Sequence, residues 1–517
     1  MKYQVVPSYV WTYPDVTDYP EGKQKAEMLA LRQGFCTFQV QFSNICGDEI
    51  ALSLEGLFGE LYRLLAIPVE SCPGIETPLP HFPERKAPFK VNDCLIPMEN
   101  GEKIKVEEES VTLYVCVKVD KDAEGILKGS VVARDRESEA RVPVEIEVSR
   151  ACLPEERLNM VMGFNPWDIK ALHDPESVEE FRAIEKQYFS LLRRQHQNMI
   201  YVRWPWEKYE DGKWSFDFRH FNRYVKTAME MGFKKFLVEG FGFRRAWDAP
   251  DILHRGIDLL SREGYEYLRQ YLTALRENLV ENGWLSGDLF MLGICDEPNE
   301  INALSYRAVA SVARKYIPEI KLYDATSGAP IYGALDIWVP RADEYEANRE
   351  IFDSYREAGD EVWHYVCLYP REGGYINRFM DIPLLSTRYL FWGNYKYGLT
   401  GYLHWTVNAY QNGCNPFEVS CPRHVNAGNE SILPPGDDKL IYPGKKEGWM
   451  SMRLENHRES AEEYSMLVTV AEKDKALADS ICDSVFKSFH SVEFDAEKFE
   501  SARRKLIRAY EKMKNEK

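Results

Sequence analysis

The sequence lacks long apolar runs and lacks an excess of positive charge. No segment of its 517 residues approaches the roughly 20 consecutive apolar residues of a membrane-spanning helix. The N-terminal stretch MKYQVVPSYVWTYP has no apolar core of a secretory signal. The formal net charge of −17 argues against nucleic acids and anionic membranes as partners, because their binders gather Lys and Arg on one face. We therefore expect a cytoplasmic protein, or a secreted one if a leader has been removed.

Cysteine pairs at metal-binding spacing are also absent. The 11 cysteines are scattered along the chain without any C-x-x-C motif, which fits free thiols in a reducing compartment better than a disulfide framework. The same scatter matches no common zinc-binding pattern. The GFGF stretch at Gly240 lacks the third spaced glycine of a nucleotide-binding loop. The sequence thus predicts neither a metal nor a cofactor.

Aromatic residues, by contrast, are plentiful. The chain has 12 Trp and 30 Tyr, more than packing alone usually requires. Flat aromatic rings are also how proteins stack against the faces of sugars. The expected partner is therefore a carbohydrate, as an oligosaccharide or a glycoconjugate, and a homo-oligomer stays open.

The rhythm of apolar residues divides the chain into parts. Residues 1–152 contain short alternating runs such as GFCTFQVQFS and VTLYVCVKV between turns, which predict an antiparallel β-sandwich. Residues 153–475 alternate eight apolar strands with amphipathic helices, which predicts a (β/α)8 TIM barrel. The link between its fifth and sixth strands is short and lacks an obvious helix. Residues 476–517 form a C-terminal helical extension.

Polar and aromatic residues gather where the expected barrel strands end. In such a barrel the chemistry lies at these carboxyl ends, although strand ends are also polar simply because they meet solvent. The ring consists of Asn165 and Trp167, Arg203 and Trp204, Glu239, Asp296 and Glu297, Tyr323 and Asp324, Trp338, Tyr369, and finally His404, Trp405 and Asn408.

Asp296 and Glu297 directly follow the fourth strand, in GICDEP. One interpretation makes them first-turn helix residues, since acids and Pro298 both suit a helix N-terminus. The other makes them a catalytic pair. Neighbours in a regular strand point to opposite faces, so both reach one pocket only if the backbone turns here. Close like charges would then keep one carboxyl protonated beside an ionised one.

A second catalytic carboxylate is missing where a conventional retaining glycosidase carries its nucleophile. The seventh strand, EVWHYVCLYP, ends at Tyr369 without an acid. Glu372 follows in a Gly-rich loop and is a poor candidate. The adjacent pair therefore suggests substrate-assisted cleavage of a glycosidic bond, in which the 2-acetamido oxygen of the substrate attacks the anomeric carbon.

Several segments together resemble glycoside hydrolase family 123. They are GICDEP, WHYVCLYP, IPLLSTRYLFWGNYKYGLTGYLHWTVNAY, GDDKLIYPG and SMRLENHRESAEEYSML, within roughly Leu158 to Glu472. The last two also resemble domain of unknown function 4091. The resemblance implies an exo-acting β-N-acetylgalactosaminidase using substrate-assisted retention. Asp296 would orient the acetamide group and Glu297 would be the general acid/base.

The other ring members receive substrate-binding roles. Trp338 and Trp405 would form a platform for the sugar, and Tyr323 or Tyr369 would hydrogen-bond the acetamide oxygen. We expect the remaining contacts from Asn165, Trp167, Arg203, His404 and Asn408. Arg453 and Glu455 are expected to form a structural ion pair. Two alternatives stay open: a glycosidase for a non-acetamido sugar with an unidentified nucleophile, and a non-catalytic carbohydrate-binding barrel.

Overall fold

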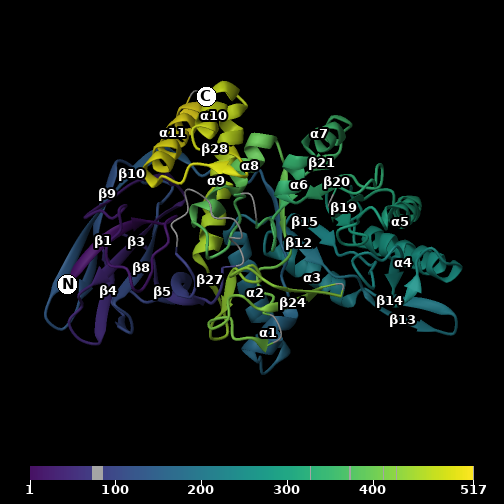
Figure 1. Ribbon diagram of the computed structural model, residues 1–517, viewed down its shortest axis with the longest axis horizontal. Helices are drawn as coiled ribbons and strands as arrows, with labels where there is room; N and C mark the ends of the chain where they lie inside the picture. Colours follow the sequence, from purple (N-terminus) through teal and green to yellow (C-terminus); the bar gives the residue numbers. More distant parts are fainter. Residues whose placement is uncertain (73–84, 327, 372–373, 411–412, 427, 516–517) are drawn as a thin grey trace.

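The computed structural model describes residues 1–72, 85–326, 328–371, 374–410, 413–426 and 428–515. Figure 1 shows an N-terminal β-rich part, a larger part built of strands and helices, and C-terminal helices between them. All 11 cysteines are free thiols. Among the described residues, no helix has the length and apolar character to span a bilayer.

The N-terminal part consists of two five-stranded sheets. The first has the order β1-β3-β8-β5-β6, with bounds Lys2–Pro7, Phe35–Ser43, Ser110–Lys118, Gly59–Val69 and Phe89–Met98. The second has the order β2-β10-β9-β4-β7, with bounds Ala26–Arg32, Glu139–Cys152, Ile126–Arg134, Glu49–Glu55 and Lys103–Lys105. The pairs are antiparallel, except that β10 and β2 run parallel, which corrects the expectation of a purely antiparallel sandwich.

Strand β8 shows why neither face of the first sheet is open to solvent there. Leu113, Val115 and Val117 fill the core between the two sheets, whereas Tyr114 and Cys116 belong to the core shared with the rest of the chain. Because successive strand residues point to opposite faces, an almost continuous apolar run serves two cores at once. The sandwich therefore packs firmly against the second part of the protein.

The strands of the second part run parallel in two sheets. The larger has the order β12-β15-β18-β19-β20-β21, with bounds Met199–Val202, Lys235–Val238, Phe290–Leu292, Lys321–Thr326, Ile337–Pro340 and Glu361–Val362. The smaller has the order β11-β23-β22, with bounds Asn159–Met162, Gly401–His404 and His364–Tyr365. One hydrophobic cluster takes residues from all of these strands except β21, which Trp363 follows directly: Val161, Met199, Leu237, Met291, Tyr323, Ala325, Ile337, Val339, Trp363, Tyr365 and Leu403.

Side chains, rather than a backbone ladder, link the two sheets at the β11–β12 junction. The Asn198 side chain accepts from Met160 N at 3.0 Å and donates to Leu158 O at 2.9 Å. Gln197 Nε2 donates to Met162 O at 3.1 Å. The six-stranded sheet is therefore not closed by its own backbone hydrogen bonds.

Helices and hairpins connect the strands. The helices are α1 Pro166–His173, α2 Val178–Arg194, α3 Arg219–Glu230, α4 Arg262–Glu281, α5 Ala303–Tyr316, α6 Ala342–Ala347, α7 Arg349–Glu357, α8 Leu385–Tyr397, α9 Met452–Ala471, α10 Lys475–Asp483 and α11 Ala496–Asn515. The hairpins are β13–β14 (Trp206–Glu210, Lys213–Asp217), β16–β17 (Leu253–His254, Ile257–Asp258), β24–β25 (Arg423–Asn426, Asn429–Ile432), β26–β27 (Ile441–Pro443, Gly448–Met450) and β28–β29 (Phe486–Ser488, Ser491–Val492). Within the described residues, no helix separates β19 from β20, as the sequence predicts.

Helix α9 is buried along nearly its whole length, although it carries many charges. Arg453 Nη2 pairs with Asp93 of the sandwich at 2.8 Å, and Glu455 pairs with Arg194 and Arg458, each at 3.1 Å. The expected Arg453–Glu455 ion pair is therefore wrong. Helix residues two positions apart point to different sides, so each finds its own partner.

Helix α11 packs between α9 and strand β10 of the sandwich (Figure 1). The Arg150 backbone N donates to Glu511 Oε1 at 2.7 Å, and Arg508 pairs with Glu147 of β10 at 2.5 Å. The C-terminal helix, which the sequence does not place, thus braces the two parts together.

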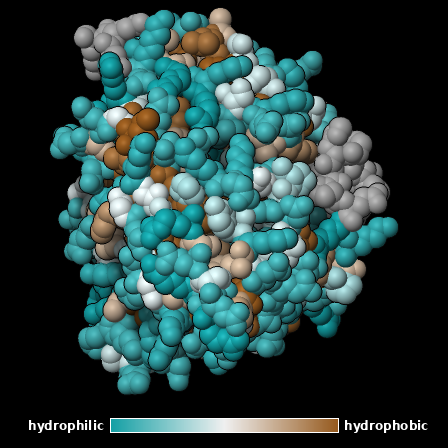
Figure 2. Space-filling model, turned by 90° about the vertical axis from the view of Figure 1, so that its left-hand side faces the viewer, coloured by the Kyte–Doolittle hydropathy of each residue, from teal (hydrophilic) through white to brown (hydrophobic). Residues whose placement is uncertain are grey.

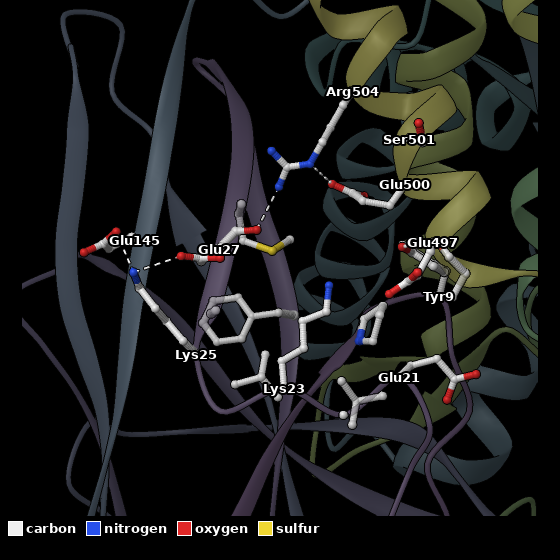
Figure 3. A pocket seen from close by; sticks show the side chains of 18 of the residues that line it. Tyr9, Glu21, Lys23, Lys25, Glu27, Glu145, Glu497, Glu500, Ser501 and Arg504 are labelled. Atoms are coloured by element: carbon white, nitrogen blue, oxygen red, sulfur yellow. Dashed lines mark hydrogen bonds and ion pairs between the residues drawn. The ribbon is translucent and has the colours of Figure 1, made fainter.

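A hollow of about 740 Å³ lies between α11 and strands β1 and β2. Its charged side chains largely pair with one another: Lys25 bridges Glu27 and Glu145, and Arg504 pairs with Glu500 (Figure 3). Figure 2 shows the adjoining N-terminal side of the molecule, where hydrophilic side chains dominate and hydrophobic ones form small separate patches. In this view no broad apolar surface marks an interface.

Candidate active site

A pocket of about 600 Å³ opens at the carboxyl ends of the parallel strands. It is lined by three carboxylates, two arginines and several aromatic side chains. These are Glu239, Asp296, Asp324, Arg203, Arg244, Tyr201, Tyr323, Trp247 and Trp405, with Phe164 and Phe243. Acids in a partly apolar pocket at this end of parallel strands are typical of enzymes.

The acidic pair lies on a turn and not on a helix. Strand β18 ends at Leu292, and α5 begins eleven residues later at Ala303, with Asn302 as its N-cap. Glu297 has a positive φ of 46°, a left-handed conformation that is incompatible with the first turn of an α-helix. Asp296 lines the pocket, and Glu297 lies beside it, reaching toward β22. The helix-start interpretation is therefore excluded.

Asp324, at the end of β19, fixes the segment that precedes the pair. Its Oδ2 accepts from Ile294 N at 2.9 Å and Cys295 N at 3.1 Å, and also from the Tyr306 hydroxyl. Burial raises the pKa of Asp324 to about 6, while the Tyr306 bond opposes this shift. With one oxygen occupied by three donors, Asp324 serves as a positioning residue for the turn.

Arg244 holds the same turn from the other side. Its Nη2 donates to the Asp296 backbone O at 2.7 Å and its Nη1 to Trp247 O at 3.1 Å. Asn299 Nδ2 also donates to Trp247 O at 2.7 Å. The pocket loop and the acidic turn are thereby joined into one unit.

Glu297 has its own partner on β22. The Tyr365 hydroxyl donates to Glu297 Oε1, and the ring of Tyr365 is buried. Within the described chain, the second oxygen of Glu297 makes no hydrogen bond. That oxygen is free to carry or deliver a proton.

Asp296 is exposed where it lines the pocket, and its surroundings favour the protonated form. Loss of surrounding water is the largest cause, and the charges of Glu297 and Asp324 add to it. Together they raise the pKa of Asp296 to about 8, against a weaker opposing effect of Arg244. Asp296 therefore holds a proton near neutral pH.

Asp296→Asn is expected to stabilise the fold at alkaline pH. Because the folded-state pKa of Asp296 is raised, its contribution is full below the ordinary value of 3.8 and is lost as pH rises through about 8. The neutral amide escapes that loss. Thermal unfolding of both proteins from pH 4 to pH 9 should show the variant gaining relative to the parent as pH rises. A difference in melting temperature that is independent of pH would contradict this.

The pocket brings together five of the predicted residues. Asp296, Asn165, Arg203, Tyr323 and Trp405 all line it. Arg203 Nε lies 3.5 Å from Glu239 Oε2, and the Tyr323 hydroxyl donates to Val238 O at 3.3 Å. Asn165 caps α1 with its side chain, accepting from Trp167 N at 3.2 Å, so little of its amide remains for a ligand.

Two predicted residues lie outside the pocket. Trp167 is 57% exposed on α1. Tyr369 lies between two cations, with Arg341 at 5.3 Å and Arg371 at 4.8 Å from its ring centroid. Glu372 lies outside the described residues.

Three predicted roles are corrected by burial. Trp338 is 1% exposed, stacks on Tyr355 at 4.2 Å and donates to Asp360 at 2.9 Å, so it faces the helix layer. His404 is wholly buried within β23. The Asn408 amide is also buried, and its two hydrogen bonds, of 2.8 and 2.9 Å, clamp the backbone of Asn165. None of these three side chains is available to a sugar.

Sequence reasoning missed several pocket residues. Tyr201 precedes Arg203 by two positions, so strand alternation could have placed both on one face. Glu239 and Asp324 stood in the predicted ring without an assigned role. Arg244 and Trp247 come from a loop without any periodic pattern, and only the folded structure places them beside Asp296.

Paired acids in an aromatic-lined pocket at the carboxyl ends of parallel strands fit a glycoside hydrolase. The chain belongs to glycoside hydrolase family 123, because the family model "Glycoside hydrolase 123, catalytic domain" matches residues 164–470. The resemblance noted in the sequence is thereby confirmed.

The fold is shared with a solved structure. A family 123 glycoside hydrolase from Clostridium perfringens, described in terms of glycolipid glycan hydrolysis, is similar over 99% of this chain and 98% of its own, with 14% identity and a TM-score of 0.75. A family 39 glycoside hydrolase from Bacteroides cellulosilyticus WH2 matches over 85% and 82%, with 12% identity and a TM-score of 0.40. No curated protein sequence matches the chain.

Proposed function

We propose that the protein removes a terminal β-linked 2-acetamido sugar, with N-acetylgalactosamine as the first candidate, by substrate-assisted retention. One observation carries this: Asp296 and Glu297 stand side by side on a turn at the pocket, and no carboxylate follows β22 among described residues 366–371. A conventional retaining enzyme needs its two acids on opposite sides of the scissile bond.

The mechanism uses the two carboxyls in different ways. Asp296, ionised, accepts the acetamide N–H and directs the carbonyl oxygen onto the anomeric carbon. As that C–O bond forms, Glu297 gives its proton to the glycosidic oxygen and the aglycone leaves. Glu297 then takes a proton from a water molecule, and that water attacks the anomeric carbon and opens the oxazoline ring. The anomeric configuration is thereby retained overall. For this chemistry the proton that Asp296 holds readily has to pass to Glu297 before the aglycone leaves.

A closed (β/α)8 barrel is the architecture that we propose for residues 153–475, between the sandwich of 1–152 and the extension of 476–517. The hydrophobic cluster drawn from both parallel sheets supports closure. The side-chain bridges of Asn198 and Gln197 would then complete the ring at the β11–β12 junction. The description of the Clostridium perfringens enzyme supports a glycoconjugate as substrate.

A second candidate function rests on Glu239. This carboxylate lines the same pocket from the end of β15, next to the strand that bears the pair. Burial raises its pKa, and Arg203 opposes the shift. Glu239 is therefore the residue that would serve as nucleophile if the substrate lacked an acetamide group. Trapping with a 2-deoxy-2-fluoro glycoside and mass spectrometry would reveal a labelled Glu239 in that case.

A panel of 4-nitrophenyl β-glycosides tests the proposal. We expect hydrolysis of the N-acetylgalactosaminide or N-acetylglucosaminide, with kcat/KM at least about 100-fold above the plain galactoside and glucoside, because only the former carry an internal nucleophile. A thiazoline analogue should inhibit competitively, since it mimics the cyclised intermediate. Equal rates on acetamido and plain sugars would reject substrate assistance.

A further inference from the structure

The loop between β15 and α4 presents three arginines at the mouth of the pocket. A smaller hollow of about 330 Å³ adjoins the pocket there, since Phe243 and Arg244 line both. Its described lining is completed by Arg245, Leu253, Arg255 and Gly256 and contains no carboxylate. The chain as a whole has 82 acidic and 65 basic residues, so a cationic hollow is unusual in this protein.

In the described part of the chain Arg245 forms no ion pair, and Arg244 forms none either, although its charge lowers the pKa of Asp296 and of Asp324 in the adjoining pocket. Arg244 donates to two backbone oxygens, and Arg245 is exposed without a salt bridge or a side-chain hydrogen bond. The hollow beside α11 differs, because its Lys25 and Arg504 are paired with glutamates. Uncompensated like charges repel, and an anionic ligand relieves that repulsion.

Arg255 is anchored from beneath. Its Nε lies 2.5 Å from Oε1 of Glu207, a buried carboxylate that also accepts from the Tyr267 hydroxyl at 3.0 Å. His254 Nε2 lies 2.6 Å from the same Glu207 oxygen, and its ring stacks on Tyr267 at 4.1 Å. Glu207 does not line the hollow, so it holds Arg255 in place and offsets part of its charge from below, and Arg245 remains the exposed arginine of the hollow without an ion pair in the described chain.

Phe243 offers an apolar surface beside these cations. Its ring is 48% exposed and packs edge-on against Trp204 at 5.6 Å. A sugar ring can lie on such a face while its acidic group meets a guanidinium, whose planar fork matches carboxylate and sulfate oxygens.

We infer that this hollow is the subsite for the sugar unit on the leaving-group side, and that it selects a unit bearing a carboxylate or a sulfate. The inference rests on the proposed function: if the pocket takes the terminal acetamido sugar, anything adjoining its mouth meets the aglycone. The substrate class is then an acidic glycan or glycoconjugate that ends in a β-linked 2-acetamido sugar.

Three disaccharides that differ only in the second unit provide the test. Each carries β-1,4-linked N-acetylgalactosamine, on glucose, on glucuronic acid or on glucose 6-sulfate. We expect kcat/KM for one or both acidic substrates to exceed that for the neutral one about tenfold or more, as a charge-assisted contact allows. The ratio should fall with added salt. The two acidic arms show whether carboxylate or sulfate is preferred.

Variants show whether the arginines cause the preference. Arg245→Gln should reduce the acidic-to-neutral ratio severalfold, and Arg245→Glu should reverse it. Arg136→Gln, on an exposed sandwich turn, removes an equal charge and should leave the ratio unchanged. If the protein cleaves the 4-nitrophenyl acetamido sugar but the acidic-to-neutral ratio of kcat/KM for the disaccharides is near one, the subsite is overturned and the proposed function is not. No cleavage of any acetamido sugar would overturn the proposed function, and the subsite with it.

Discussion

Glu297→Gln is expected to lower kcat/KM about 10³-fold for an alkyl or sugar leaving group, but less than about tenfold for a 2,4-dinitrophenyl glycoside. General acid catalysis contributes roughly 10²–10⁴-fold, and only poor leaving groups need the proton. The Tyr365 bond to one Glu297 oxygen remains possible with the amide, so the turn should keep its shape. A Brønsted series of aryl leaving groups measures the change directly.

Two other variants serve as references. Asp296→Asn should slow the reaction for every leaving group alike, because orientation of the acetamide precedes departure of any aglycone. Glu300→Gln alters an exposed acid three residues further along and should behave like the parent protein. An equal loss across the whole leaving-group series in Glu297→Gln would remove Glu297 from the acid role.

The residual reaction of Glu297→Gln should also report on Asp296. With an activated leaving group no acid is needed, and the rate should rise with pH as Asp296 loses its proton. The charge of Glu297 helps to raise the pKa of Asp296, so its removal should place the midpoint below about 8. A midpoint at or above that value would contradict the coupling of the two carboxyls.

The fold of the catalytic part was largely predictable because its strands and helices follow simple periods. Apolar strands such as FKKFLV and LFML precede helices with a clear hydrophobic face, and the short β19–β20 link stands out for lack of one. The parallel β2–β10 pair was not predictable, since the alternation of apolar and polar residues in a strand does not show in which direction its neighbour runs.

The residues of the candidate site were likewise predictable only where a local sequence pattern places them. Arg203 and Trp405 directly follow strands and Asp296 comes four residues after one, so counting strands brought them together. Trp338 failed because alternation turns it to the helix side, where Asp360 accepts its indole N–H. Arg244 and Tyr365 were missed because their partners, Asp296 O and Glu297, lie about 50 or more residues away along the chain.

Helix α9 was beyond prediction for a third reason. Its sequence, MRLENHRESAEEYSML, has no apolar face, yet its charged side chains are buried. Their partners come from separate elements: Asp93 from β6, Arg194 from α2 and Arg388 from α8. Charge complementarity across such sequence distances leaves no local pattern.

The Arg453–Asp93 pair joins the sandwich to the catalytic part, and Arg453→Met is expected to cost about 3–5 kcal/mol of unfolding free energy, since it leaves a buried charge without its partner. Both side chains are wholly buried, and among the described residues Asp93 would keep only the hydrogen bond from the Tyr442 hydroxyl, at 2.6 Å. Urea and thermal unfolding measure the loss. Lys475→Met, which breaks an exposed pair with Asp479, should cost well under about 1 kcal/mol.

A double variant distinguishes the charge from the packing. If the cost of Arg453→Met comes from the orphaned carboxylate, Asp93→Leu in the same chain should recover part of the stability, because two apolar side chains need no counter-charge. If the cost comes instead from the Arg453 bonds to the carbonyls of Gly436 and Lys439, the second substitution will recover nothing. Recovery would mean that each member of the pair is needed chiefly to balance the charge of the other, so that losing one alone weakens the contact between the sandwich and the catalytic part.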